Sequence, residues 1–379
     1  MPEPDAQPRL TRLRLADFRS YGALDLACDA PLVALCGPNG AGKTNILEAI
    51  SLLTPGRGLR RATFPAMPRR GGPGGFAIYA ELAGATGILS LATALAPGEP
   101  QRQCRIDREP VASANRFLDH LALLWLTPDQ DGLFRGPAGD RRRFLDRLVL
   151  AVDPAHGSRA NAFEQALRHR NRLLEDFSSD PRWLEAIEQE VVELGVALAA
   201  ARLETVARLS ALVAADRESM APFPHAVIAL EGALETQLSA EPAARVEDWY
   251  RAALRDNRAR DRAAGRALVG PQAADLAVLH GPKAEPAATC STGEQKALLL
   301  GLVLAQARLI AQMRGTPPLL LLDEIAAHLD RTRRDALFAI LHALGGQVFM
   351  TGTDTLLFEG VAGRGLLLGV GEGRVEPAS

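Results

Sequence analysis

The stretch GPNGAGKT at residues 37–44 matches the phosphate-binding pattern GxxxxGK[ST] at every position. The apolar run PLVALCG (31–37) precedes it and NILEAISLL (45–53), which has helical spacing, follows it, so the expected order is strand, loop, helix. Glycines in such a loop let backbone N–H groups surround a phosphate, while Lys43 reaches the β- and γ-phosphates and the Thr44 hydroxyl binds Mg²⁺. The predicted phosphate-binding residues are Gly37, Pro38, Asn39, Gly40, Ala41, Gly42, Lys43 and Thr44.

A P-loop of this kind needs a magnesium-binding carboxylate at the end of a neighbouring buried strand. The run LLLLDE (319–324) has this form. Asp323 is predicted to hold Mg²⁺, directly or through water, and Glu324 is predicted to polarise the attacking water as the catalytic base. Asp129 is a further candidate for the metal. The alternative for the two acids is a strand that merely ends in solvated carboxylates.

The pentapeptide STGEQ (291–295) stands about 30 residues before that strand. Ser291 and Glu294 form a capping-box pattern, so a helix is expected to begin here and to offer a second anion site. A single fold cannot easily aim both helix N-termini at one γ-phosphate, which favours two subunits that each complete the other's site. Ser291, Gly293 and Gln295 are then the predicted contacts to the partner's nucleotide, although a plain N-cap would also explain this pentapeptide alone.

Two further segments belong to the same pattern. His328, Leu329 and Asp330 follow the paired acids, and a loop at the dimer interface, with Asp330 as its key residue, is expected there. Thr351 and Thr353 end the next predicted strand, where a sensor of the γ-phosphate is expected.

The chain divides into three parts by pattern. Runs with strand character fill the N-terminal part, residues 113–266 are helical and rich in Ala, Leu, Arg and Glu, and the alternation of strands and helices resumes after 267. The stretch 183–220 is amphipathic but lacks the heptads of a long coiled coil, and packed helices, two antiparallel ones among the options, are expected. We therefore expect an α/β fold in which residues 1–112 and 267–379 form one head domain and 113–266 form an inserted, mostly helical arm.

The order and spacing of these motifs resemble the RecF family of SMC-like ABC-type ATPases over nearly the whole chain. Four stretches point to that family: LADFRSYGALDL (15–26), LTPDQDGLFRGPAGDRRRFLDRLV (126–149), LRHRNRLL (167–174) and LVGPQAADL (268–276). The family's proline after the glycine is displaced in this chain, which reads Gly136-Pro137-Ala138, so the chain departs from the family pattern at Ala138. It also departs at Gln272 and Ala273, where a histidine and a basic residue are usual.

The resemblance implies an ABC-type ATPase head with an inserted arm, ATP and Mg²⁺ as cofactors, and a role in recombinational DNA repair and the processing of replication gaps. It also implies dimerisation on ATP, binding to DNA at gaps and at junctions of single and double strands, and cooperation with RecR and RecO in loading RecA. Slow hydrolysis of ATP would release the dimer. The rivals are a transporter's nucleotide-binding subunit, which would lack the arm, another SMC-like ATPase with a long coiled coil, and a clamp with a vestigial ATPase.

Net charge does not indicate a nucleic-acid partner, because it is −2 with a pI of about 6.4. A basic surface must therefore be local. The glycine-rich loop 56–75 is the first candidate for DNA phosphates, with a solvated loop as the alternative. Its arginines, with no acid among them, are Arg57, Arg60, Arg61, Arg69 and Arg70. Arginine runs at 141–143 and 251–266 are further candidates, for which helix packing and a solvated helix face are the alternatives.

The remaining composition indicates a soluble cytoplasmic protein. Four cysteines without CxxC spacing suggest free thiols in a reducing compartment, and no signal peptide or convincing span of about 20 apolar residues is visible. Among 43 lysines and arginines, lysine appears only at Lys43, Lys283 and Lys296, which we interpret mainly as coding bias.

Overall fold

The structure is a computed structural model that divides into two compact units. The first, here called the sheet unit, comprises Met1–Asp131, Glu218–Pro224 and Leu299–Ser379. The second, here called the helical unit, comprises Gly132–Arg217 and His225–Leu298. The residues described are 8–84, 87–176, 180–218, 220–326, 329–361, 363–371 and 373–378.

These limits differ from the domain boundaries that the sequence suggested after residues 112 and 266. Residues 113–131 stay with the sheet unit because β8 (Leu123–Leu126) pairs in parallel with β12 (Leu319–Leu322). Residues 267–298 join the helical unit, where β10 (Asp275–His280) pairs with β9 (Ala226–Glu231). In both places, a strand pairs with another strand that is distant in the sequence, and this pairing decides to which unit the segment belongs.

The sheet unit is built on a six-stranded sheet with the order β15-β14-β3-β13-β12-β8. All neighbours in it are parallel except β15 against β14. Its central strands are buried along their whole length, as expected for a parallel sheet covered on both faces. The carboxyl ends of β3, β12 and β13 therefore meet at one edge. The bounds not yet given are β3 (Leu32–Cys36), β13 (Val348–Gly352), β14 (Leu366–Gly371), β15 (Arg374–Pro377), α1 (Lys43–Ser51) and α9 (Arg331–Leu344).

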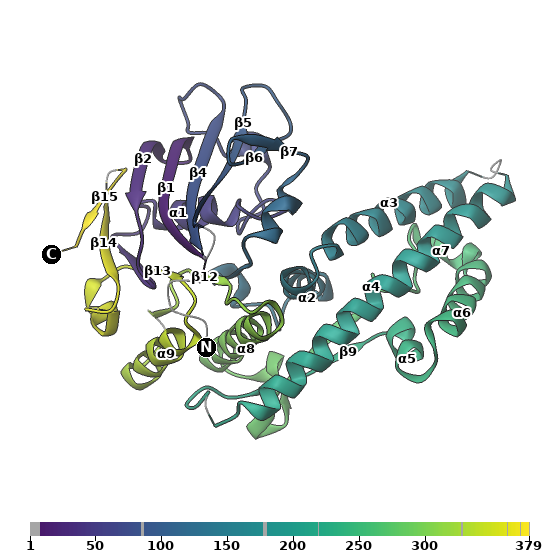
Figure 1. Ribbon diagram of the computed structural model, residues 1–379. Helices are drawn as coiled ribbons and strands as arrows, with labels where there is room; N and C mark the ends of the chain where they lie inside the picture. Colours follow the sequence, from purple (N-terminus) through teal and green to yellow (C-terminus); the bar gives the residue numbers. More distant parts are fainter. Residues whose placement is uncertain are drawn as a thin grey trace. The chain divides into compact units, whose positions relative to one another are not determined.

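A second, antiparallel sheet has the order β2-β1-β4-β5-β6-β7, and its first strands lie side by side in Figure 1. The apolar–polar alternation within β1 suits this sheet, because Leu13 and Leu15 face inward while Arg14 and Ala16 are exposed. Leu13, Ile78, Leu47 of α1 and Phe349 of β13 belong to one buried cluster, so both sheets share a core with the P-loop helix. The strands are β1 (Arg9–Phe18), β2 (Tyr21–Ala27), β4 (Phe76–Gly84), β5 (Gly87–Leu95), β6 (Gln103–Ile106) and β7 (Glu109–Val111).

The helical unit is dominated by α3 (His156–Glu175) and α4 (Pro181–Ala215), which run side by side (Figure 1). The alternative of two antiparallel helices within 183–220 is wrong, because α4 is one helix of 35 residues. The helix continues through Gly195. A Cβ at this position would lie 2.9 Å from the Tyr250 ring, so the glycine serves close packing. The other elements are α2 (Ala138–Val152), α5 (Ala233–Ala240), α6 (Ala243–Asp256), α7 (Arg258–Ala264) and β11 (Glu285–Pro286).

The boundary between the units falls within α8 (Thr292–Arg314). Within the described residues this helix alone is long and apolar enough to cross a membrane, but 72% of its most apolar window is buried inside the protein. It is therefore weak evidence for a membrane span, since the core helix of a soluble protein has the same composition. Short 3-10 helices lie at Phe64–Ala66, Ala114–Asp119, Pro128–Gln130, Gly281–Lys283, Ala287–Thr289 and Thr355–Val361.

Candidate nucleotide site

The P-loop runs from the end of β3 to the start of α1. Its first residue is anchored to the neighbouring strand, because the Gly37 N–H donates to the Gly352 carbonyl at 3.2 Å. Gly42, the last residue before the helix, has φ +108, and a Cβ there would lie 2.7 Å from the Tyr21 hydroxyl oxygen. Only glycine suits this position, since it combines a left-handed backbone with close contact to the turn between β1 and β2.

The loop has the unpaired donors that a phosphate would need. In the part of the chain that the structure describes, the N–H groups of Asn39, Gly40 and Gly42 donate to no backbone acceptor. The Lys43 ammonium, on a side chain only 5% exposed, donates to the Gly37 and Pro38 carbonyls at 2.6 and 2.9 Å, and no carboxylate among those residues pairs with it. This buried, uncompensated cation at a helix N-terminus fits an anionic ligand.

Side-chain oxygens of the kind that bind Mg²⁺ lie beside the loop. Asp323, directly after β12, accepts hydrogen bonds from the Thr351 hydroxyl at 2.7 Å and from the Thr44 hydroxyl at 3.0 Å. Burial raises the pKa of Asp323, and these two hydrogen bonds oppose the rise. No cluster of three or more His, Cys, Asp or Glu suited to a metal occurs among the described residues, so a dedicated protein cage is absent there. One carboxylate and one hydroxyl fit Mg²⁺, which completes its shell with water and substrate phosphates.

Glu324 has an unusual backbone. Its φ is +53, a left-handed conformation that glutamate rarely adopts, and its N–H donates to the Thr351 hydroxyl at 2.9 Å. Its carboxylate has no hydrogen-bond or ion-pair partner in the described residues. Thr351 therefore fixes the backbone at Glu324 while its side chain stays available, which suits a base that orients water.

The two predicted sensor threonines have different surroundings. Thr351 is fully buried and bridges Asp323 and Glu324, whereas Thr353 is exposed and makes no side-chain hydrogen bond within the described ranges. Asp129 is also exposed, in the 3-10 turn after β8, and its neighbour Gln130 caps that turn through the Thr127 N–H at 3.0 Å. The structure brings Thr351, and not Thr353, to the paired acids.

The predicted partner-side residues belong to the helical unit. The capping box is present: the Ser291 N–H donates to Glu294 Oε2 at 3.0 Å, and the Glu294 N–H donates to Ser291 Oγ at 3.4 Å. Ser291 and Gly293 are exposed at the start of α8. Gln295 is only 2% exposed, and its amide donates to the Cys290 carbonyl at 2.7 Å. Two of the three predicted contacts are therefore accessible, while the third side chain secures the segment before the helix.

The predicted dimer loop is described only in part. Asp330 is exposed and acts as the N-cap of α9, where its Oδ1 accepts from the Arg333 N–H at 2.8 Å. His328 lies outside the described residues.

The arginine loop is less free than its sequence suggested. The sequence showed no acid within the loop, but Glu48 of α1 pairs with Arg60 at 3.2 Å and Asp17 of β1 pairs with Arg69 at 2.9 Å. Arg61 also has an interaction partner. Arg57 and Arg70 are exposed, and neither pairs with an acid in the described ranges. The loop contains no acid, as its sequence shows, but three of its five arginines have partners, and Arg57 and Arg70 remain unpaired with any acid among the described residues.

Sequence reasoning missed the group that ties this loop to the P-loop helix. Glu48 is fully buried and accepts two hydrogen bonds from Arg19, at 2.5 and 2.8 Å, besides the one from Arg60. Arg60 also donates to the Asn45 side chain at 2.6 Å. The only signals were the Phe-Arg pair ending the first strand and a glutamate on the buried face of a helix, and neither indicates its partner.

The other arginine runs are mainly structural. Arg141 pairs with both oxygens of Asp275 at 2.7 Å, and Arg142 donates to the Ala274 carbonyl at 2.6 Å. Arg258 pairs with the buried Glu188 at 2.6 Å. These contacts hold α2 and α7 in the helical unit, so packing explains these positions better than DNA does.

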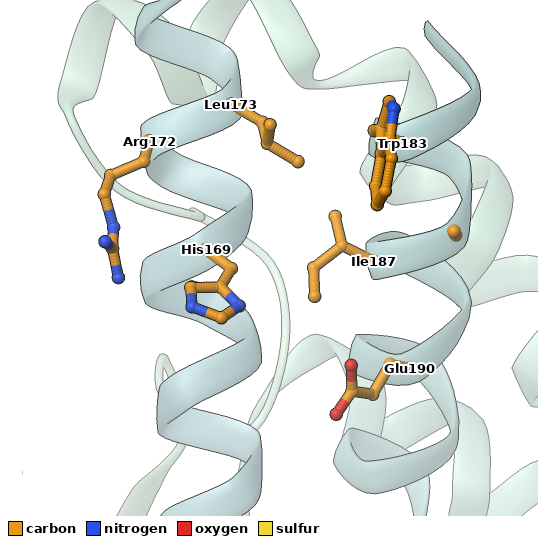
Figure 2. A pocket seen from close by; sticks show the side chains of 7 residues that line it. His169, Arg172, Leu173, Trp183, Ile187 and Glu190 are labelled. Carbon is orange, nitrogen blue, oxygen red and sulfur yellow. The ribbon is translucent and has the colours of Figure 1, made fainter. Parts of the chain in front are cut away.

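A separate pocket of about 460 Å³ lies between α3 and α4. Figure 2 shows Leu173 and Ile187 pointing toward each other between the helices, with Trp183 above Ile187. Trp183 is 69% exposed. None of the residues lining this pocket belongs to a nucleotide motif. The full lining is His169, Arg172, Leu173, Trp183, Ala186, Ile187 and Glu190.

Comparison with known proteins agrees with this geometry. The family model for an AAA domain matches residues 12–70. A "DNA replication and repair protein RecF" of Mesorhizobium japonicum is 55% identical over 375 residues, covering 98% of each chain. The solved structure of the recombination mediator protein RecF with ATP has a TM-score of 0.87 at 19% identity, covering all of both chains. The Smc head domain of Pyrococcus furiosus has a TM-score of 0.55 at 16% identity, covering 98% of this chain and 96% of that one.

The fold and the P-loop motifs define the head of an SMC-like ABC-type ATPase with an inserted, mostly helical arm. Within that class, the sequence identity of more than 50% to relatives that are matched over 98% of their length decides the family. The chain belongs to the RecF family of DNA replication and repair proteins. The resemblance drawn from the motifs is thereby confirmed.

Proposed function

We propose that this protein is an ATP-controlled DNA-binding switch in recombinational repair. ATP joins two copies, the dimer binds DNA at gaps and at junctions of single and double strands, and slow hydrolysis releases it. RecR and RecO are the proposed partners, and loading of RecA is the proposed outcome. The observation that carries this proposal is the buried Lys43 ammonium at the head of a helix, which has no carboxylate partner among the described residues.

The chemistry follows from the residues around β12. Lys43 and the unpaired loop N–H groups would hold the β- and γ-phosphates, and Thr44 with Asp323 would hold Mg²⁺. Mg²⁺, when bound, supplies positive charge that neutralises the phosphates and orients them. Glu324 then orients the attacking water and accepts its proton, a role that a carboxylate without a competing partner can fill.

The dimer is the second element of the proposal. Ser291 and Gly293 present the start of α8, where N–H groups favour an anion. If the γ-phosphate held by one copy contacts this helix in the other, ATP controls association. Light scattering should then show monomer without nucleotide and dimer with ATP and Mg²⁺, while Lys43→Ala should remain monomeric. A parent protein that stays monomeric at saturating ATP and micromolar concentration contradicts the proposal.

DNA contact is assigned to the two free arginines of the loop, Arg57 and Arg70. The half-buried Arg102 holds the base of this loop by donating to the Leu52 carbonyl and, at 2.6 Å, to the Thr54 carbonyl. Each phosphate contact removed should reduce the slope of log K against log salt by about one unit. The double variant Arg57→Ala/Arg70→Ala should therefore lose about two units, at unchanged ATP affinity.

The matched control is Arg116→Ala, which removes an exposed arginine paired with Asp119 at 3.3 Å, away from the loop. It should leave the slope as in the parent. Salt titrations of affinity for gapped duplex, with all proteins saturated with ATP, provide the comparison. Equal slopes for the parent and the double variant would remove the loop from the DNA-binding surface.

A further inference from the structure

Lysine is rare in this chain, and its three positions are not scattered. Lys43 is the P-loop lysine, Lys283 precedes the signature serine Ser291 by eight residues, and Lys296 lies in the helix that begins after it. Everywhere else among the 43 lysines and arginines the chain uses arginine. Coding bias explains the arginines but not why lysine is kept at these positions.

Lys283 acts on the start of α8 through one carboxylate. Its Nζ lies 2.7 Å from Glu294 Oε1. The other oxygen, Glu294 Oε2, accepts from the Ser291 N–H at 3.0 Å and from the Ser291 hydroxyl at 2.8 Å. All three residues belong to the helical unit, and both members of the ion pair are partly exposed, with 45% of the Lys283 side chain accessible.

The carboxylate creates an electrostatic problem for a phosphate. Lys283 and the Ser291 donors lower the pKa of Glu294 to about 2, so it is ionised at physiological pH. It occupies the serine hydroxyl and places a negative charge at the helix start where an incoming phosphate needs positive potential. An unneutralised glutamate at this position would repel a nucleotide.

We propose that Lys283 is a positioning residue of the nucleotide site between two copies. Its ammonium neutralises Glu294 through one oxygen and leaves the capping box in place, so that no uncompensated negative charge beside Ser291 repels the γ-phosphate of the nucleotide bound to the other copy. The inference rests on the proposed ATP-dependent dimer. It also explains the choice of lysine. An arginine fork binds both oxygens of a carboxylate, which would draw Oε2 away from the Ser291 N–H and break the capping box, whereas an ammonium binds one oxygen as a point charge.

The test separates charge from helix capping. Lys283→Met removes the charge and should weaken ATP-driven dimerisation by up to about fivefold per site, the upper range for an exposed ion pair. A symmetric dimer contains two such sites, so the dimerisation constant should fall by up to about 25-fold. Lys283→Met/Glu294→Gln leaves no charge to neutralise and should return to the parent value. Lys283→Arg should fall between the parent and Lys283→Met.

Sedimentation equilibrium with ATPγS and Mg²⁺ gives the dimerisation constants, and fluorescent ATP binding should be the same in every variant because Lys43 is unchanged. Circular dichroism confirms folding. A Lys283→Met protein that dimerises like the parent, or a double variant as weak as Lys283→Met, overturns the role of Lys283 while leaving the ATP-dependent dimer intact. A parent that stays monomeric overturns both.

Discussion

Thr351→Val tests the geometry at the paired acids most directly. The substitution keeps the β-branched shape in a fully buried strand and removes only the hydroxyl. That hydroxyl donates to Asp323 at 2.7 Å and accepts from the Glu324 N–H at 2.9 Å. One change therefore removes one of the two hydroxyl donors to the Asp323 carboxylate, leaves the Glu324 N–H without its acceptor, and releases the left-handed backbone at Glu324.

The expected cost follows from those two bonds. A buried donor without a partner costs about 1–3 kcal/mol, and a hydrogen bond to a charged group contributes about 1.5–3 kcal/mol. Because the two effects overlap, we expect the free energy of unfolding of the sheet unit to fall by about 2–4 kcal/mol. Hydrolysis should fall by roughly 10²-fold, the lower range for loss of a positioned general base.

Urea unfolding is followed by tryptophan fluorescence in a background with Trp183→Phe and Trp249→Phe, so that the signal comes from Trp125 in β8 beside β12 and reports on this unit. Steady-state ATP hydrolysis reports on the base. Thr353→Val is the matched control, because Thr353 is exposed and should tolerate the change. Thr351→Ser should recover most of the activity since it retains the hydroxyl. If Thr351→Val unfolds and hydrolyses ATP like the parent, the hydroxyl does not position Glu324 and the reasoning fails.

Three further outcomes are expected. Glu324→Gln should keep ATP binding, lose hydrolysis by about 10²-fold or more and accumulate as an ATP-bound dimer in gel filtration. Gly42→Ala should abolish ATP binding measured by calorimetry, because the added Cβ meets the Tyr21 hydroxyl at 2.7 Å, while Gly40→Ala, with nothing within 4 Å, should show only the milder effect of its positive φ. Burial raises the pKa of Glu235, so the parent loses stability as pH rises through that raised pKa. Glu235→Gln should gain about 2 °C in thermal midpoint at mildly alkaline pH, and the gain should vanish as pH falls below the ordinary value of 4.5.

The sequence predicted which segments meet beside the P-loop because its motifs follow buried parallel strands. An apolar run that ends in GPNGAGKT or in DE indicates both a strand and the edge at which its functional residues appear. The contact between Thr44 and Asp323, 279 positions apart, could therefore be expected without coordinates. Such a contact follows from the sequence because the topology of a parallel sheet of this kind leaves few alternatives.

The ion pairs of the arginine loop could not be predicted in the same way. Local sequence shows which charges are neighbours along the chain, but Arg60 and Arg69 find their acids on α1 and β1. The two threonines Thr351 and Thr353 show the same limit. A strand of known direction does not reveal where it leaves the sheet, and that point separates a buried bridge from an exposed hydroxyl.

The charges of the two anion-binding regions also differ in a way that bears on the dimer. A nucleoside triphosphate is a polyanion, and in the proposed complex Mg²⁺ and Lys43 neutralise most of its charge at the P-loop. The start of α8 then needs only a weakly positive potential, and the helix N-terminus provides about half a unit charge. Glu294 alone would exceed that charge and reverse its sign, while Glu294 paired with Lys283 adds no net charge. The capping glutamate can therefore stay in a phosphate-binding motif because a lysine accompanies it, and changing either residue alone should alter dimerisation more than changing both.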